Sequence, residues 1–287
     1  MTSSTGGPND PSLEPTWREI LRELEVTPSK ALGQNFLHDR KIVRRIVSVA
    51  DIDDSVDVLE IGPGLGILTQ ELVNHAGSVT AVELDSKLAA RLGDYFKDRA
   101  RIFEGDILQV NLPDVLPSTP YIVVANLPYS VATAAVQRMF EAETPPERMV
   151  IMVQREVAER MVARPPEMSI LAVAVQFYAT AKIQFRIGSG AFIPAPRVES
   201  SVIRLDLHAE PPLPRATHPD FFRLVKAGFS QRRKRLDNSI ASSLRVAKAD
   251  VSEALVLGGL DPSRRAETFD VSEWVQLFHH SGEILGD

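Results

Sequence analysis

The feature that most constrains the fold is an alternation of short apolar runs with helix-patterned segments, which extends from about residue 41 to residue 125. Strands joined through helices of about ten residues require right-handed crossovers, and such crossovers build a parallel sheet. Ligands of an open parallel sheet bind beyond the carboxyl ends of its strands. The predicted strands are residues 56–61, 79–84, 101–103 and 121–125, and the predicted helices between them are residues 68–73 and 87–96.

The rest of the chain divides into a tail, an extension of the sheet and a helical end. Residues 1–16 are rich in Pro, Gly and Ser and are predicted to be disordered, and residues 17–24 have the apolar spacing of a short helix. Three prolines within residues 208–218 indicate a linker. We therefore predict a tail (1–16), a sheet domain (17–207) and a helical domain (208–287).

Local patterns refine these last two parts. After a strand at 150–153 and a helix at 155–163, two β-rich segments at 183–187 and 201–207 flank a proline-punctuated loop at 190–196. Residues 169–180 fit a helix or a strand equally well. In the helical end, Asp261-Pro262 and Ser272 are predicted helix caps.

Composition excludes several classes of protein. The chain has no Cys, so it holds no disulfide, no thiolate metal site and no cysteine nucleophile. With 32 basic and 38 acidic side chains the net charge is −6, so nucleic acid would have to bind through local basic patches. There is no apolar run of membrane-spanning length and no leader pattern before Arg18, so we expect a cytoplasmic protein without membrane contact.

Two of the predicted strands end in groups suited to a nucleoside ligand. Residues 60–66 (EIGPGLG) form a glycine-rich turn, which lets a ligand approach the backbone closely, although such a turn can also be only a turn. Glu83 ends the next strand, where a carboxylate can accept both hydroxyls of a ribose. A nicotinamide dinucleotide is disfavoured, because its fingerprint would need a third glycine where Ile67 stands.

The two other strand ends carry polar groups of their own. Asp106 follows residues 101–103 and can accept from an adenine amino group, or it can cap a helix. Asn126 follows residues 121–125, within the sequence Asn-Leu-Pro-Tyr (126–129). An exocyclic amine has its lone pair delocalised into the ring, and two acceptors aimed at its N–H bonds can draw the nitrogen towards tetrahedral geometry. The side-chain oxygen of Asn126 and the carbonyl of Leu127 suit that task, and the ring of Tyr129 offers a stacking face for a base.

Together these motifs resemble the rRNA adenine N6-dimethyltransferases, and within them the KsgA/RsmA type of the small ribosomal subunit. The likeness extends from about residue 30 to residue 277. The motifs that carry it, in chain order, are residues 33–37 (GQNFL), 60–64 (EIGPG), 82–85 (VELD), 105–106 (GD), 126–129 (NLPY), 192–200 (FIPAPRVES), 229–235 (FSQRRKR) and 261–267 (DPSRRAE).

The resemblance implies a Rossmann-like α/β sheet with a small all-α C-terminal domain, and S-adenosylmethionine as the methyl donor. The implied donor-binding residues are Asn35, Leu37, Gly62, Glu83, Asp106 and Asn126. The acidic edge formed by Glu60, Glu83 and Asp106 suits a sulfonium cation, and an electrophilic methyl group needs no metal, so none is expected.

The resemblance also implies an RNA target. Asn126 and Leu127 would align the amine, and Tyr129 and Phe192 would stack on the base. The basic run Arg232, Arg233, Lys234 and Arg235 would contact rRNA phosphates, although such a run can be only a solvated helix face. The implied reaction is dimethylation of two adjacent adenosines near the 3′ end of 16S rRNA in the small subunit, by a monomer, with a role in subunit biogenesis.

Two alternatives remain open at this point. The resistance-type methyltransferases of large-subunit rRNA share the donor motifs, but they tend to have Ile where this chain has Leu127, and residues 229–235 and 261–267 fit the small-subunit type better. The other alternative is a non-catalytic ribosome assembly factor on the same fold. The chain departs from the family pattern at residues 165–171 (PPEMSIL) and at Arg197, where Lys is frequent.

Overall fold

The computed structural model describes residues 34–116, 120–128 and 131–286, together with the single positions Glu19, Leu21, Arg22 and Pro28. The predicted tail at 1–16 lies outside the described residues, as does Tyr129. Of the predicted helix at 17–24, Glu19, Leu21 and Arg22 are described, and each is helical.

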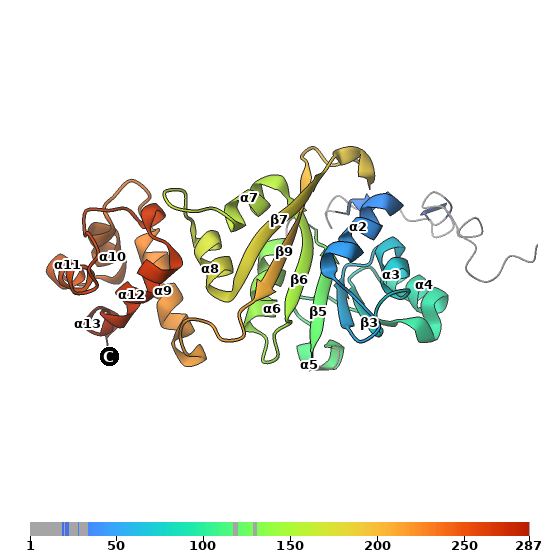
Figure 1. Ribbon diagram of the computed structural model, residues 1–287, viewed down its shortest axis with the longest axis horizontal. Coiled ribbons are helices and arrows are strands. Elements are labelled where there is room, and N and C mark those ends of the chain that lie inside the picture. The colour runs from blue at the N-terminus through green and yellow to red at the C-terminus, as the bar shows by residue number, and fades with distance from the viewer. Residues whose placement is uncertain are drawn as a thin grey trace, which may run out of the picture.

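Among the described residues, seven strands form one sheet in the order β4-β3-β2-β5-β6-β9-β7 (Figure 1). The neighbours from β4 to β6 pair in parallel, whereas β9 pairs antiparallel with both β6 and β7. The predicted parallel sheet is therefore confirmed. The strands are β1 (Phe36–Leu37), β2 (Asp57–Ile61), β3 (Ser78–Glu83), β4 (Arg101–Glu104), β5 (Tyr121–Asn126), β6 (Arg148–Gln154), β7 (Ala179–Ile187), β8 (Phe192–Ile193) and β9 (Ser200–Leu207).

Helices cover both faces of the sheet, which explains why its central strands are apolar throughout. Adjacent residues of β5 belong to different hydrophobic clusters: Val123 is in the cluster that contains Val115 and Ala135, and Val124 is in the cluster that contains Val47 and Leu72. The helices are α2 (Arg40–Ala50), α3 (Ile67–Leu72), α4 (Ser86–Phe96), α5 (Leu112–Val115), α6 (Ala132–Glu141), α7 (Arg155–Met161), α8 (Ile170–Tyr178), α9 (His218–Gly228), α10 (Leu236–Leu244), α11 (Lys248–Leu257), α12 (Val271–His279) and α13 (Gly282–Leu285).

The ambiguous segment at 169–180 is a helix and the start of a strand. Ser169 caps α8, because its side chain accepts from the amide of Ala172. The helix ends at Tyr178 and β7 begins at the next residue, four residues earlier than the predicted strand at 183–187. Long-range pairing with β9 decides this boundary, and local periodicity does not register such pairing.

The loop predicted at 190–196 contains a strand, which corrects the prediction. In it Phe192 pairs with Leu37 and Ile193 with Phe36, so that β8 and β1 form a two-stranded sheet. This pairing attaches residues from the start of the described chain to a loop more than 150 positions later. It sets one wall of the site.

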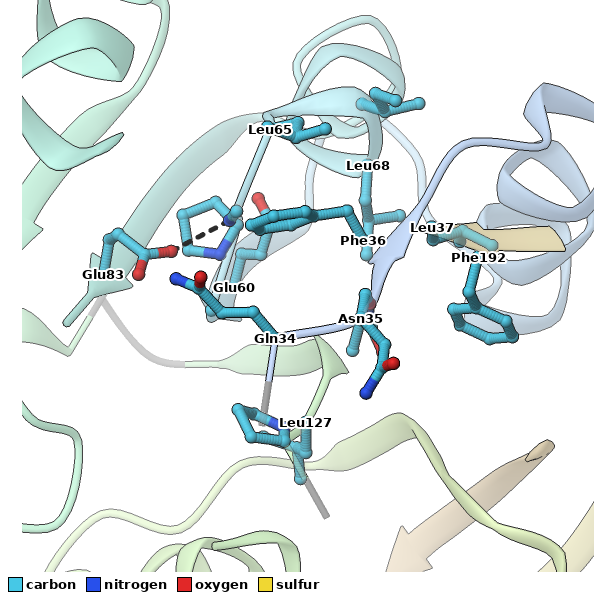
Figure 2. A pocket seen from close by; sticks show the side chains of 16 residues that line it. Gln34, Asn35, Phe36, Leu37, Glu60, Leu65, Leu68, Glu83, Leu127 and Phe192 are labelled. Carbon is cyan, nitrogen blue, oxygen red and sulfur yellow. Dashed lines mark hydrogen bonds between the residues drawn. The ribbon is translucent and has the colours of Figure 1, made fainter. Parts of the chain in front are cut away.

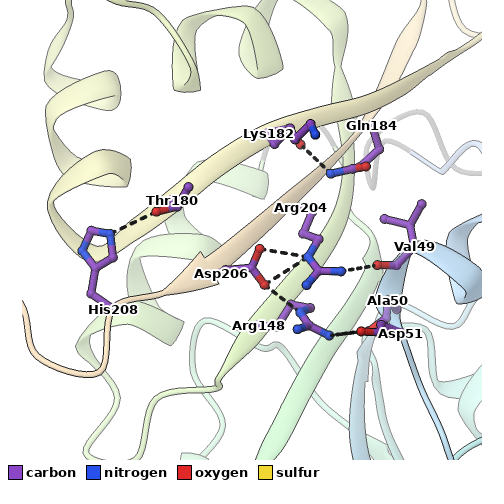
Figure 3. Close-up of polar contacts among 10 residues, drawn as sticks. All are labelled: Val49, Ala50, Asp51, Arg148, Thr180, Lys182, Gln184, Arg204, Asp206 and His208. Carbon is purple, nitrogen blue, oxygen red and sulfur yellow. Dashed lines mark hydrogen bonds and ion pairs between the residues drawn. The ribbon is translucent and has the colours of Figure 1, made fainter.

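A cluster of polar side chains attaches the end of α2 to the sheet (Figure 3). Arg148 donates to the backbone oxygen of Ala50 at 3.0 Å, and Arg204 donates to that of Val49 at 3.1 Å. Asp206 accepts from the Nε of both guanidinium groups, at 2.7 and 2.9 Å. The terminal carbonyls of α2 are thereby satisfied, and the helix that follows β1 is held in place.

The C-terminal helices α9 to α13 lie beyond the β7 edge, at one end of the molecule (Figure 1). The rings of Phe177 in α8 and Phe221 in α9 stack at 4.7 Å, and one hydrophobic cluster extends from the sheet into these helices. The domain boundary near residue 208 stays a prediction.

Both predicted caps of this region were wrong. Asp270, not Ser272, caps α12, in a capping box with Glu273, and Asp261 accepts from the amide of Ser263 in a turn. Within the described ranges, no helix combines the length and apolarity needed to cross a membrane.

Candidate active site

The glycine-rich turn after β2 forms the floor of the site. Gly62, Gly64 and Gly66 have φ values of +70°, +57° and +82°, in the left-handed region that favours glycine. The amide of Gly62 donates to the oxygen of Val82 at 2.9 Å, which attaches the turn to the end of the neighbouring strand β3. The turn thus presents bare backbone at the carboxyl edge of the sheet.

Glu83, at the end of β3, is 6% exposed and holds this turn from the side. Its Oε2 accepts from the amide of Gly64 and its Oε1 from the amide of Asp85, each at 2.9 Å. Burial raises the pKa of Glu83 above its usual range, and the two amide donors oppose that effect. Each carboxylate oxygen keeps acceptor capacity beyond its single amide bond, so the geometry is compatible with ribose hydroxyls.

Glu60 lies deeper, at the bottom of the same pocket, and is 1% exposed. Among the described residues no group hydrogen-bonds to its Oε2. Burial raises the pKa of Glu60 to about 8, the neighbouring Thr69 opposes that rise, and the charge of Glu83 adds to it. The sequence placed Glu60 on an acidic edge but gave no sign that its carboxyl group would be buried with an unpaired oxygen.

The opposite wall comes from β1, β8 and the end of β5 (Figure 2). The side-chain amide of Asn126 donates to the backbone oxygen of Asn35 at 3.2 Å. The ring of Phe36 lies over the glycine turn, so close that a Cβ on Gly64 would be 3.0 Å from it. The ring of Phe36 therefore packs closely against the turn, and a side chain at position 64 would crowd it.

Between these walls is a pocket that is open to solvent, and its space, with the open solvent at its mouth included, is about 720 Å³. Most of the predicted site residues line it: Asn35, Leu37, Gly62, Glu83, Asn126, Leu127 and Phe192. The pocket therefore joins the glycine turn to the loop of Asn126, which the sequence placed on separate strands.

Phe192 lines the pocket but offers no free face for stacking in this conformation. Its side chain is 3% exposed, and its ring points away from Asn35 into the cluster that contains Leu37 (Figure 2). The pairing of β8 with β1 accounts for this orientation, because it carries the ring into the core. Its stacking role stays a prediction.

Asp106 is not among the residues that line the pocket. Its carboxylate accepts from the amide of Leu108 at 2.9 Å and from the side chain of Gln109 at 2.8 Å. The preceding amide, of Gly105, donates to the oxygen of Glu83 at 2.8 Å. Asp106 therefore lies in a turn that is closed by its own hydrogen bonds, next to the strand end that carries Glu83. Its contact with an adenine stays a prediction.

The basic run lies far from this pocket, in the turn before α10 at the C-terminal end of the molecule (Figure 1). Arg232, Arg233 and Lys234 are exposed. Arg235 is bound to Asp237 at 2.8 Å, and the side chain of Asp237 is fully buried. All four predicted RNA contacts are thus exposed to solvent, and Arg235 is in addition held by its ion pair with Asp237.

Comparison with known proteins identifies related sequences along nearly the whole chain. A family profile described as "Ribosomal RNA adenine dimethylase" matches residues 27–280. "Ribosomal RNA small subunit methyltransferase A" of Dehalococcoides mccartyi is 40% identical over 270 residues, which cover 93% of each chain. The protein of that name from Geobacillus kaustophilus is 38% identical, over 94% of this chain and 96% of its own.

Solved structures agree on the fold. The 23S rRNA methyltransferase ErmE superposes with a TM-score of 0.69 at 28% identity, over 86% of this chain and 99% of ErmE. A dimethyladenosine transferase from Plasmodium falciparum superposes with a TM-score of 0.72 at 22% identity, over 87% and 98%. The predicted Rossmann-like methyltransferase sheet, followed by helices at the C-terminal end of the chain, is confirmed.

Proposed function

The chain belongs to the ribosomal RNA adenine dimethylase family, and on that premise we propose that it dimethylates the N6 amines of two adjacent adenosines near the 3′ end of 16S rRNA. The donor is S-adenosylmethionine. The observation that carries this proposal is the shared pocket, in which Asn126 lies opposite the glycine turn and Glu83. A donor and a target base can meet only where both half-sites open into one space.

The residues of the pocket fit a cationic donor. Glu60 and Glu83 are both buried there, and no Lys or Arg is among the described residues that line it. None of the described residues hydrogen-bonds to Oε2 of Glu60, and a positively charged ligand would favour the ionised form of this buried carboxyl group. In the proposed complex, Gly62 contacts the methionine part, Glu83 the ribose and Asp106 the adenine, and Asn35 and Leu37 close over the donor.

The donor supplies an electrophilic methyl group on a sulfonium. The target nitrogen attacks the methyl carbon, the carbon–sulfur bond breaks with its electron pair left on sulfur, and S-adenosylhomocysteine is released. The methylated nitrogen then loses a proton to solvent. Oδ1 of Asn126 and the carbonyl oxygen of Leu127 accept from the N–H bonds of the amine, and this contact makes the lone pair available.

Reaching that amine requires the adenine to leave its stack, which costs a few kcal/mol. Tyr129 and Phe192 would stack on the extruded base and offset part of this cost, and for Phe192 the ring has to turn out of the core. The exposed cations Arg232, Arg233 and Lys234, with Arg235 beside them, would contact phosphates of the folded RNA. We propose that the enzyme acts as a monomer in the cytoplasm, on the 16S rRNA of the small ribosomal subunit, with a role in subunit biogenesis.

One experiment separates this proposal from its alternatives. The protein is incubated with methyl-labelled donor and with undermodified small or large ribosomal subunits, and the labelled nucleotide is mapped. We expect label on two adjacent adenosines near the 3′ end of 16S rRNA. Label on large-subunit rRNA would indicate the resistance type, and binding of subunits without label would indicate an assembly factor.

A further inference from the structure

We propose that Arg138 is a positioning residue that connects the donor's adenine site to the loop that aligns the target amine. Arg138 is half-buried near the end of α6. Its Nη1 donates to the backbone oxygen of Leu108, and its Nη2 donates to that of Val110. The inference rests on the proposed function, because it concerns the adenine contact assigned there to Asp106.

The loop that Arg138 holds is organised around Asp106. The backbone oxygen of Asp106 accepts from the amides of Gln109 and Val110, both at 2.8 Å, in addition to the side-chain contacts described above. A Cβ on Gly105 would lie 2.6 Å from the side chain of Val110, so the loop folds tightly on itself. The carbonyls of Leu108 and Val110 are the points at which Arg138 fixes this closed unit.

The other end of α6 begins at the target loop. The amides of Val131 and Ala132 donate to the oxygen of Pro128 at 3.0 and 3.1 Å, two residues after Asn126. One helix therefore starts at the predicted amine-binding loop and, through Arg138, ends on the predicted adenine loop. A displacement of α6 would change both sites together.

Two features indicate that Arg138 acts through geometry and not through its charge. Within the described part of the chain it forms no ion pair, and both of its contacts are with backbone oxygens. Its planar, fork-like guanidinium can hold two carbonyls at a fixed separation, which the single ammonium of Lys cannot reproduce. We therefore expect Lys at this position to be a partial substitute only.

A merely structural role for Arg138 would reduce stability without changing which nucleoside the pocket prefers. The test compares S-adenosylhomocysteine with its inosine analogue, in which an oxygen replaces the amino group that Asp106 would bind. Affinities for both ligands are measured by calorimetry for the wild type, Arg138→Gln, Arg138→Lys, Asp106→Ala and the double variant Asp106→Ala/Arg138→Gln. Gln137→Ala is the matched control, because Gln137 lies beside Arg138 on α6, is exposed, and its side chain donates to Oε1 of Glu141 at 2.8 Å on the same helix.

We expect the wild type to prefer the adenosyl ligand by about tenfold, as one hydrogen bond to a carboxylate would give. Arg138→Gln should lose most of that preference, Arg138→Lys about half of it, and Gln137→Ala none. Arg138→Gln should also add little to Asp106→Ala in the double variant. Thermal melts confirm that each variant is folded, and Arg138→Lys provides the comparison if Arg138→Gln does not fold.

A folded Arg138→Gln or Arg138→Lys variant with the full wild-type preference would overturn the inference. A wild type without any preference would overturn it as well, since there would be no adenine contact for Arg138 to support. Neither result would decide the proposed function, which is tested separately by methylation of small subunits.

Discussion

The side-chain amide of Asn126 and the backbone oxygen of Asn35, which are 91 positions apart in the sequence, form a hydrogen bond of 3.2 Å across the mouth of the pocket. Because the nitrogen Nδ2 is the donor, the contact also determines on which side the acceptor oxygen Oδ1 lies. The segment that would close over the donor thus orients the side chain that would align the target. Asn126 would therefore take part both in closing the pocket over the donor and in aligning the target amine.

Replacing Asn126 by Ala should therefore separate catalysis from donor binding. Loss of an oriented polar group aimed at the reacting atom typically costs about 10² to 10³ in rate. Loss of the contact with Asn35 should weaken binding of S-adenosylhomocysteine by no more than about tenfold. Methyl transfer to small subunits and calorimetric binding measure the two effects, and full activity in this variant would rule out the amine-alignment role.

Gly62→Ala should weaken donor binding through the backbone. The φ of Gly62 is +70°, where an L-residue is strained by about 1–2 kcal/mol, and the added Cβ would lie 3.7 Å from the oxygen of Asn126. The strain, and not a clash, should move the turn and raise the dissociation constant for S-adenosylhomocysteine about tenfold.

Gly93→Ala is the matched control for that substitution. Gly93 lies within α4, and among the described residues no atom beyond its chain neighbours and the nearby backbone of this helix is within 4 Å of the Cβ that Ala would add. A helical Ala should stabilise the protein by about 0.5–1 kcal/mol and leave donor binding unchanged. Equal effects of the two substitutions on binding would argue against a role for the Gly62 conformation.

The sequence predicted the parallel strands well because their signal is local. Each apolar run contains β-branched residues, and the runs at 56–61 and 121–125 are followed directly by Gly62 and Asn126. The pairing of Leu37 with Phe192 has no local signal, since it depends on how two distant segments meet. For the same reason the burial of Phe192 could not be predicted from the motif that contains it.

The burial of Glu60 leads to a prediction about pH. The pKa of Glu60 is about 8 in the folded protein, against 4.5 for the unperturbed group, and burial is the main cause. Between these two values the folded state holds a proton that the unfolded state has lost. The contribution of Glu60 to folding stability should therefore be fully present below about pH 4.5 and should fall as the pH rises towards 8, by up to about 1.4 kcal/mol per unit.

Glu60→Gln provides the comparison, because Gln has nearly the same shape and does not ionise. Urea unfolding at several values between pH 5 and pH 8 should show the variant gaining on the wild type as the pH rises. Glu83, whose pKa is also raised, is present in both proteins, so most of its contribution should cancel. A constant difference in the free energy of unfolding across this range would contradict the assignment.

The sheet and the C-terminal helices should unfold together. Besides the stacking of Phe177 on Phe221, the hydroxyl of Tyr178 lies 3.0 Å from Nδ1 of His218, and both residues are buried. Phe177→Ala should cost about 3–5 kcal/mol, as for other large core residues. Calorimetry should show a single transition at a lower temperature. Two transitions, only one of them shifted, would indicate that residues 208–287 form an independently folding domain.

The basic turn should contribute to rRNA binding through charge alone. Arg232, Arg233 and Lys234 are exposed, so replacing all three by Gln should change the fold little. Each phosphate contact that is lost should reduce the slope of log affinity against log salt by about 0.7 to 0.9. Filter binding of small-subunit rRNA at several salt concentrations should therefore show weaker binding and a slope lower by about two to three. Arg235→Gln is measured separately, because Arg235 is also bound to the buried carboxylate of Asp237. This substitution should lower the melting temperature in addition to lowering the salt slope by at most the value of one phosphate contact. An unchanged slope in the triple variant, with normal folding, would place the RNA-binding surface elsewhere.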